Sequence, residues 1–139
     1  MQKLVVDSSV IVKWLNQQDE KLISQADKIL SDAQDQNVML LAPELAKYEI
    51  GNAMLLHKNI SVSEAEIIFK DLFLFPIQFI DQSEDLANET YKIAKDSKIT
   101  YYDASFMALA KQEKAILVTD NPKHQGKAID IKVIPLVEY

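Results

Sequence analysis

The chain has 139 residues, of which 48% are hydrophobic and 26% charged, and its formal net charge at pH 7 is −6. This composition is typical of a globular protein, and the length fits a single domain covering residues 1–139. The absence of cysteine excludes disulfide frameworks and thiolate zinc sites. With two glycines and four prolines, a turn-rich all-β fold is disfavoured. The negative charge counts against a nucleic-acid partner without deciding the matter.

Short apolar strands are expected to alternate with longer amphipathic helices. In chain order, the pattern predicts a strand at 3–6, helices at 8–17 and 20–36, a strand at 38–42, helices at 43–56 and 61–75, a strand at 77–80, helices at 83–97 and 101–113, and strands at 115–119 and 131–134. Pro43 is placed in the first turn of its helix, and Ser61 with Glu64 forms a capping-box pattern. Strands that alternate with helices imply parallel βαβ units and an α/β sandwich.

Nothing in the sequence predicts a membrane segment. The apolar run near the N-terminus is too short for a signal peptide. No stretch approaches the roughly 18–20 apolar residues that a spanning helix needs. A soluble cytoplasmic protein with no membrane partner is therefore expected.

Four acidic residues stand in apolar surroundings. Asp7 ends one expected buried strand and Asp120 ends another, while Glu49 and Asp103 lie on helix faces that should point inward. On a helical wheel, four apolar residues fall within about 60° of Glu49: Leu45, Ala46, Ala53 and Leu56. Phe106, Met107 and Ala110 surround Asp103 in the same way. A carboxylate in such a setting is neutralised, paired or bound to a cation, and no matching set of buried Lys or Arg is evident.

Each acid also has an ordinary structural interpretation. Asp7 fits a helix N-cap, and Asp103 completes a capping-box pattern with Thr100. Asp120, followed by asparagine and proline, fits a plain turn. Glu49 is the acid for which a solvated position fits least well, and Asn52 lies on the same helix face, where it could orient a ligand or water.

Taken together, the four acids predict a metal site. Ligands of parallel α/β sheets bind beyond the carboxyl ends of the strands, where Asp7 and Asp120 are expected. Oxygen ligands select hard cations such as Mg²⁺ or Mn²⁺, and such cations polarise phosphoryl groups and activate water. The chemistry that follows is phosphodiester hydrolysis. Local positive charge for a nucleic acid is available from five residues: Lys13, Lys47, Lys123, His124 and Lys127.

Ordered blocks along the whole chain carry a family resemblance. They are Val5-Val6-Asp7-Ser8-Ser9-Val10 with Lys13-Trp14, then Ala42-Pro43-Glu44-Leu45 through Glu49-Ile50-Gly51-Asn52-Ala53, then Tyr102-Asp103-Ala104-Ser105 with Ala108-Leu109-Ala110, and last Leu117-Val118-Thr119-Asp120-Asn121. In these blocks the chain resembles the PIN-domain ribonucleases, specifically the VapC-like toxins of toxin–antitoxin pairs. The resemblance implies a three-layer α/β/α domain with a central parallel sheet of about five strands.

The resemblance also implies a Mg²⁺- or Mn²⁺-dependent endoribonuclease site. Asp7, Glu49 and Asp103 match the acidic positions of the family, and Ser9 and Thr119 match supporting positions. The fourth position departs from the usual Thr-x-Asp pattern, so either Asp120 supplies a carboxylate one residue early or Asn121 serves as a neutral ligand. Such toxins usually form homodimers, and the tail of a cognate antitoxin fills the active-site groove. Apolar residues that could serve an interface, or equally an internal core, are Leu22, Ile68, Phe69 and Leu72.

Two other functions compete with RNA hydrolysis. One is a non-catalytic binding module on the PIN fold, in which the acids serve folding or partner binding. The other is an aspartate-based phosphoryl-transfer protein with Asp7 as nucleophile, which would want a lysine at the end of a later strand. The sequence shows no convincing lysine there.

Overall fold

A computed structural model describes residues 1–122 and 130–139. Within these ranges, five parallel strands form one sheet in the order β3-β2-β1-β4-β5. The strands are β1 (Gln2–Val6), β2 (Val38–Pro43), β3 (Ile77–Ile80), β4 (Ile116–Thr119) and β5 (Val133–Pro135). The parallel sheet predicted from the alternating pattern is confirmed.

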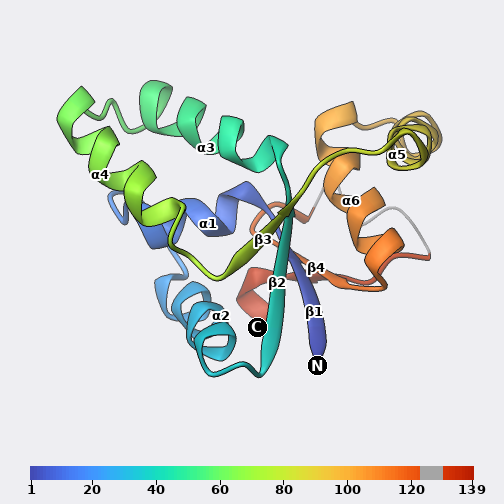
Figure 1. Ribbon diagram of the computed structural model, residues 1–139, viewed down its shortest axis with the longest axis horizontal. Helices are drawn as coiled ribbons and strands as arrows, with labels where there is room; N and C mark the ends of the chain where they lie inside the picture. The colour runs from blue at the N-terminus through green and yellow to red at the C-terminus, as the bar shows by residue number, and fades with distance from the viewer. Residues whose placement is uncertain (123–129) are drawn as a thin grey trace.

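Helices cover both faces of the sheet (Figure 1). The described α-helices are α1 (Ser8–Leu15), α2 (Ile23–Gln34), α3 (Leu45–Leu56), α4 (Val62–Leu72), α5 (Glu84–Ser97) and α6 (Tyr101–Glu113), and a short 3₁₀ helix η1 (Leu136–Glu138) follows β5. In Figure 1, α1 to α4 lie to the left of the sheet and α5 and α6 to the right. This is the three-layer α/β/α arrangement that the family resemblance implied.

The core lies on both sides of β1, the central strand. Leu4, Val5 and Val6 are at most 2% exposed, as expected for a parallel strand covered by helices on both faces. Helix α6 packs across β1, β2 and β4, and its residues 104–110 are all buried. Because α6 is tightly packed, the acid in its first turn is held in a fixed position relative to the ends of these strands.

Several expected boundaries differ from the structure. Helix α2 begins at Ile23 rather than at residue 20, because Asp19 and Leu22 adopt positive φ angles of 59° and 58° that interrupt the helix. Pro43 is the last residue of β2 and pairs with Ile80 of β3, so its placement in a helix was wrong. The backbone N–H of Glu44 continues this pairing with the carbonyl of Ile80 at 3.0 Å. Helix α4 ends at Leu72, three residues earlier than expected.

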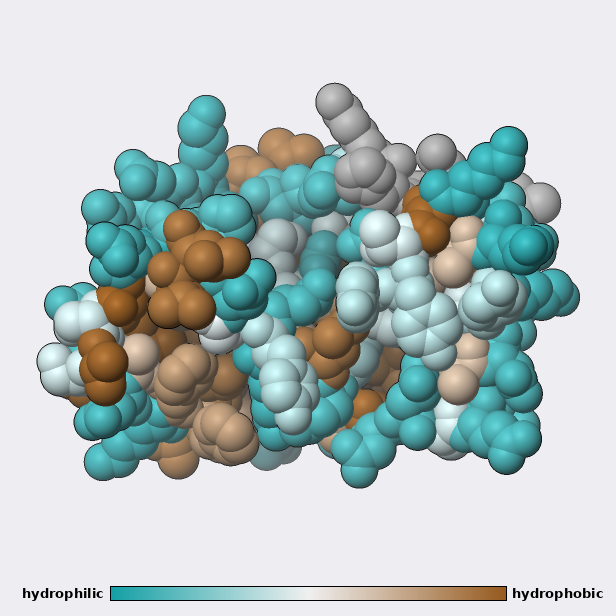
Figure 2. Space-filling model, turned by 90° about the horizontal axis from the view of Figure 1, so that it is seen from above, coloured by the Kyte–Doolittle hydropathy of each residue, from teal (hydrophilic) through white to brown (hydrophobic). Residues whose placement is uncertain are grey.

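The expected interface residues are internal. Ile68 and Leu72 are only 8% and 1% exposed, and the partly buried Leu22 and Phe69 pack against the core. The alternative of an intramolecular core is therefore the correct one for these four. The large exposed apolar side chains on and beside α3 and α4 are instead Tyr48, Leu55, Leu56, Val62, Ile67, Phe73 and Leu74. Figure 2, seen from above, shows an apolar patch on the side of the molecule where α3 and α4 lie.

Among the described residues, no helix is both long enough and apolar enough to cross a membrane.

Candidate active site

The candidate site lies where β1 and β4 end side by side. In the sheet, β2 lies on one side of β1 and β4 lies on its other side. The direction in which the chain winds therefore reverses between β1 and β4. This crevice at the carboxyl ends is where open α/β sheets bind ligands. Asp7 directly follows β1, and its backbone N–H donates to the carbonyl of Val118 in β4 at 3.1 Å.

Asp7 occupies the N-cap position of α1, but its side chain makes no capping hydrogen bond. Instead its Oδ2 accepts a 2.6 Å hydrogen bond from the hydroxyl of Thr119 at the end of β4. Burial raises the pKa of Asp7, and the negative charge of Asp103 raises it further. Hydrogen bonds from Thr119, the backbone of Ser8 and the hydroxyl of Ser9 oppose this only in part. The carboxylate is therefore held in a place where its ionised form is disfavoured.

Glu49 lies on α3 and meets α1 through Ser8, whose hydroxyl donates to Oε1 at 2.7 Å. Burial raises the pKa of Glu49, and the charges of Asp7 and Asp103 add to the shift, while the bond from Ser8 opposes it. The buried face of α3 is formed by Ala46, Ile50 and Met54. Glu49 is half-buried at the edge of that face rather than in its middle.

Leu56, which the helical wheel placed beside Glu49, is 64% exposed, so the wheel was wrong there. The wheel groups residues by angle, whereas Leu56 lies at the last position of α3, two turns beyond Glu49, where the helix has no cover on that side.

Asp103 enters the cluster from the first turn of α6. Thr100 caps this helix by accepting the backbone N–H of Asp103 at 3.0 Å. The capping interpretation is therefore confirmed for Thr100, and it leaves the carboxylate of Asp103 half-buried and close enough to raise the pKa of both Asp7 and Glu49. The structure thus brings together three of the four acids singled out from the sequence.

Asp120, the fourth acid, is paired with a lysine. Its Oδ2 lies 3.0 Å from Nζ of Lys13, a side chain of α1 that is only 1% exposed. Lys13 Nζ also lies 3.0 Å from Glu20 and donates to the carbonyl of Lys21 at 2.7 Å. The expectation that no buried lysine matches the acids is therefore wrong for Asp120.

Burial of Lys13 on its own would lower its pKa, but the hydrogen bonds that its ammonium group donates to Glu20 and Asp120 outweigh burial and raise the pKa. The lysine is therefore charged at neutral pH. From the sequence alone, Lys13 was grouped with the cations available to a nucleic acid. Its position between Val12 and Trp14 on a short apolar helix was the available signal that it is buried.

The supporting residues join these groups. The hydroxyl of Ser9 accepts the backbone N–H of Asp120 at 3.3 Å, and the hydroxyl of Thr119 accepts the backbone N–H of Asn121 at 3.0 Å. Asn52 is exposed and lines the same recess as Glu49. Ser8 was missed as a supporting residue, although its hydroxyl donates a hydrogen bond to the carboxylate of Glu49.

The donor chemistry of the three acids fits a hard divalent cation. Among the described residues, neither Asp7 nor Glu49 forms an ion pair with a cationic side chain, and both have raised pKa values. A bound cation would relieve this electrostatic cost. As they stand in the described part of the chain, no three acidic or histidine side chains are arranged closely enough to hold a metal ion. Binding would therefore require the carboxylates to close around the cation.

The positive charge expected for a nucleic acid is only partly placed by the structure. Lys47 forms an ion pair with Glu44 at 3.1 Å and lies over the rings of Phe73 and Phe79 at 4.5 and 4.6 Å. It is therefore near the carboxyl end of β2 but already neutralised. The other expected cations besides Lys13, namely Lys123, His124 and Lys127, lie outside the described residues.

The fold and the position of the acids define a parallel α/β domain with a carboxylate cluster at its switch point. The sequence model of the PIN domain family matches residues 4–129, and the chain belongs to that family. The chain is also 26% identical over 121 residues to "Ribonuclease VapC3" of Pyrobaculum aerophilum, a match that covers 84% of this chain and 88% of that protein.

Solved structures agree on the fold. The VapBC2 structure from Rickettsia felis, bound to a DNA fragment from its promoter, superposes with a TM-score of 0.71 at 16% identity and covers 96% of this chain and 98% of that one. VapC20 of Mycobacterium tuberculosis, described as a Sarcin-Ricin loop cleaving toxin, gives 0.68 at 10% identity, with 93% and 98% covered. At these identities the likeness establishes the three-dimensional arrangement alone.

Proposed function

We propose that this protein is a divalent-metal-dependent endoribonuclease that acts as the toxin of a toxin–antitoxin pair. Membership of the PIN domain family and the likeness to a protein named ribonuclease VapC3 support the class of activity. The observation that carries the proposal is the convergence of Asp7, Glu49 and Asp103 at the end of β1, where burial and mutual repulsion raise the pKa of Asp7 and Glu49.

In this proposal Asp7, Glu49 and Asp103 hold Mg²⁺ or Mn²⁺. When bound, such a cation polarises the phosphoryl group and lowers the pKa of water. The chain fixes the geometry: Thr119 orients Asp7, and Ser8 orients Glu49. Both hydroxyls donate to carboxylate oxygens, so they favour the ionised form that a cation needs. These hydrogen bonds limit the orientations of the two carboxylates, which still have to close around the cation.

The fourth position is open to Asp120 or Asn121. The ion pair with Lys13 engages the carboxylate of Asp120, which favours the amide of Asn121 as a neutral ligand. Asp120→Asn would then leave cleavage closer to the wild-type rate than Asn121→Ala does. The reverse order would assign the position to Asp120.

The main test is cleavage of defined RNAs with Mn²⁺, with Mn²⁺ and excess chelator, and with single acids neutralised. Asp7→Asn and Asp103→Asn should each abolish Mn²⁺-dependent cleavage, and chelator should abolish it in the wild type. Asp27→Asn is the matched control, because Asp27 is an exposed acid on α2 outside the cluster. Undiminished cleavage by Asp7→Asn or Asp103→Asn would refute the assignment.

A non-catalytic binding module is the second candidate. The observation in its favour is that no three acidic or histidine side chains among the described residues are arranged to hold a metal ion as they stand. Titration calorimetry with Mn²⁺ distinguishes the two: heat that is lost in Asp7→Asn supports the enzyme, and no heat supports the binding module. Phosphoryl transfer from Asp7 is disfavoured, because the buried Lys13 contacts Asp120 rather than Asp7.

The partners belong to the same proposal. RNA is the substrate, a cognate antitoxin is the inhibitor, and the protein acts in the cytoplasm as a homodimer of single-domain chains. Structures of a toxin–antitoxin complex from Klebsiella pneumoniae and of VapBC from Salmonella typhimurium have this fold, with TM-scores of 0.67 and 0.69. Light scattering of the purified chain, alone and with the product of a neighbouring reading frame, tests both assemblies.

A further inference from the structure

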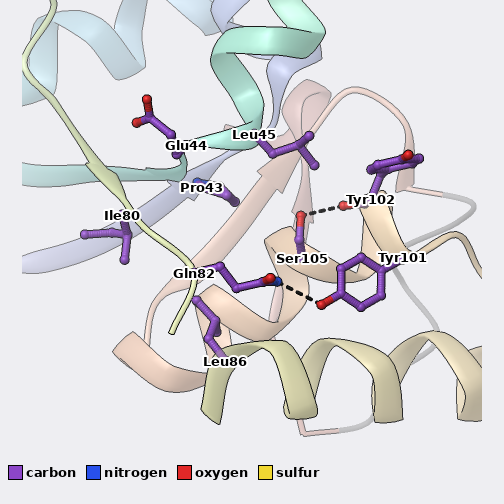
Figure 3. Close-up of a pocket in the computed structure, with 9 residues that line it drawn as sticks. All are labelled: Pro43, Glu44, Leu45, Ile80, Gln82, Leu86, Tyr101, Tyr102 and Ser105. Carbon is purple, nitrogen blue, oxygen red and sulfur yellow. Dashed lines mark hydrogen bonds between the residues drawn. The ribbon is translucent and has the colours of Figure 1, made fainter. Parts of the chain in front are cut away.

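A pocket opens beside the acid cluster, at the carboxyl ends of β2 and β3. Its volume is about 170 Å³. Figure 3 shows side chains from α3, α6 and the segment after β3 turned toward it. The lining residues are Pro43, Glu44, Leu45, Ile80, Gln82, Leu86, Tyr101, Tyr102 and Ser105. None of these belongs to the proposed metal-binding set.

This pocket shares a wall with the recess of the candidate active site. Leu45 and Tyr102 line the pocket and also line the recess that contains Glu49 and Asn52. Leu45 is four residues before Glu49 on α3, about 6 Å along the helix axis, and Tyr102 directly precedes Asp103. A polymer held at the acids therefore reaches the pocket with the unit next to its reacting bond.

The size of the pocket suits one aromatic ring system. An engineered cavity of about 150 Å³ in another protein accepts a benzene molecule. The slightly larger pocket in this chain can therefore accommodate a planar ring, but not a helix or a strand of a partner protein. Its floor is apolar, with Pro43, Ile80 and Leu86 contributing. Tyr102, at the rim, is 60% exposed, so its ring is free to stack against a planar ligand.

Polar groups at the rim can bind the edge of such a ring. The amide nitrogen of Gln82 donates to the hydroxyl of Tyr101 at 3.0 Å, which fixes the amide and leaves its oxygen without a hydrogen-bond partner among the described residues. The hydroxyl of Ser105 donates to the carbonyl of Tyr102 at 2.6 Å and can still accept. Both hydrogen bonds are drawn in Figure 3. Two acceptors beside an apolar slot suit a ring that carries exocyclic amino or ring N–H groups.

We propose that this pocket is a nucleobase subsite, which receives one unstacked base next to the phosphate held at the acid cluster. The base stacks on Tyr102, and its edge donates to Gln82. This inference rests on the proposed ribonuclease function and names its substrate class as single-stranded or looped RNA, because a paired base cannot leave its helix at low cost. Base–aromatic stacking is a common source of affinity for single strands.

The first test compares cleavage of a single-stranded RNA by pocket variants. Tyr102→Ala should lower kcat/KM on the order of 10-fold, mainly through KM, from the loss of one stacking contact. Tyr102→Phe should stay near wild type, since it keeps the ring. Tyr91→Ala is the control, because Tyr91 is 63% exposed on α5 and lines neither the pocket nor the recess.

A substrate change gives a readout that a general structural role would not produce. An RNA with an abasic residue next to the cleaved bond should be a poorer substrate for the wild type, and Tyr102→Ala should not respond to the missing base. Independent, additive effects of the two changes overturn the proposal. So does a result in which Tyr102→Ala leaves RNA cleavage unchanged and instead weakens binding of the antitoxin, which would assign the pocket to a protein side chain.

A binding arm separates this proposal from the ribonuclease proposal. The wild type is titrated in Mn²⁺ with an RNA analogue whose backbone linkages cannot be hydrolysed and that carries 2-aminopurine at successive positions. A change in fluorescence at one position that Tyr102→Ala abolishes supports the subsite even when the wild type cleaves no RNA. Cleavage by the wild type with no position-dependent signal leaves the ribonuclease standing and refutes the subsite. Absence of both cleavage and signal refutes both.

Discussion

The lysine buried beside the candidate site provides a test of how charge is managed in this fold. In Lys13→Met, the apolar stem of the side chain is retained and the ammonium group is lost. The three partners of that group, Glu20, Asp120 and the carbonyl of Lys21, then lose their donor. Removing one partner of a buried ion pair costs about 3–5 kcal/mol when the remaining charge stays dry.

In Lys13→Met the remaining carboxylates are partly exposed to solvent, so the loss of stability should be smaller. The side chains of Glu20 and Asp120 are 19% and 34% exposed, and Glu20 keeps Lys58 at 2.8 Å. We therefore expect Lys13→Met to lower the free energy of unfolding by about 2 kcal/mol, since water and Lys58 compensate part of the buried-pair penalty. For a chain of this length, that loss lowers Tm by roughly 7 °C.

Thermal and urea unfolding measure this change without metal or RNA. The matched control is Lys111→Met, because Lys111 also contacts two carboxylates, Glu89 and Asp130, but is exposed. Exposed pairs contribute little, so this control should shift Tm much less. The double variant Lys13→Met with Asp120→Asn removes one uncompensated charge and should recover part of the loss. Equal shifts for the two lysine variants would refute the argument from burial.

Three further predictions concern the acids and the hydroxyls that hold them. Because the pKa values of Asp7 and Glu49 are raised on folding, both carboxyls bind protons more tightly in the native state, and stability should fall as pH rises from their unfolded pKa values of about 3.8 and 4.5 through the native ones. Glu49→Gln should flatten this decline in stability and raise Tm at pH 7 in chelator, and it should abolish Mn²⁺-dependent cleavage. Melting temperatures that fall with pH as steeply as in the wild type would contradict this prediction. Ser8→Ala removes a bond that lowers the pKa of Glu49, so the acid limb of the pH–rate profile should move to higher pH; a profile that stays in place would show that Glu49 does not limit that limb. Thr119→Val should cost about 1–3 kcal/mol, because it leaves the buried carboxylate of Asp7 with one donor fewer; urea unfolding measures the loss, and Thr119→Ser should largely restore it.

Several features could be read from local sequence because their causes are local. Ser61 caps α4 and Thr100 caps α6, and both follow from hydroxyl side chains placed three residues before an N–H group. The boundaries of α2 were not predictable in this way, since the positive φ of Leu22 has no sequence marker such as glycine. The loop before α2 is fixed instead by contacts between Lys13, Glu20 and Lys58.

In the candidate site, too, some features follow from local sequence and others depend on contacts between distant segments. Asp7, Glu49 and Asp103 could be singled out because a carboxylate in an apolar pattern is costly wherever the chain places it. The sequence could not show that Asp120, at an equally apolar strand end, is held by a buried lysine 107 positions earlier in the chain. Ser8 was missed for a related reason, since its partner Glu49 lies on another helix.

Hydrophobic periodicity and the cost of buried charge act within each segment, so the alternation of strands and helices, the parallel sheet and three candidate acids could be predicted from the sequence. The packed fold was needed to show which acid has a cationic partner, which hydroxyl holds which carboxylate, and where the pocket bounded by Tyr102 lies. These features depend on distances between segments far apart in the chain, and such distances are set when the helices pack on the sheet.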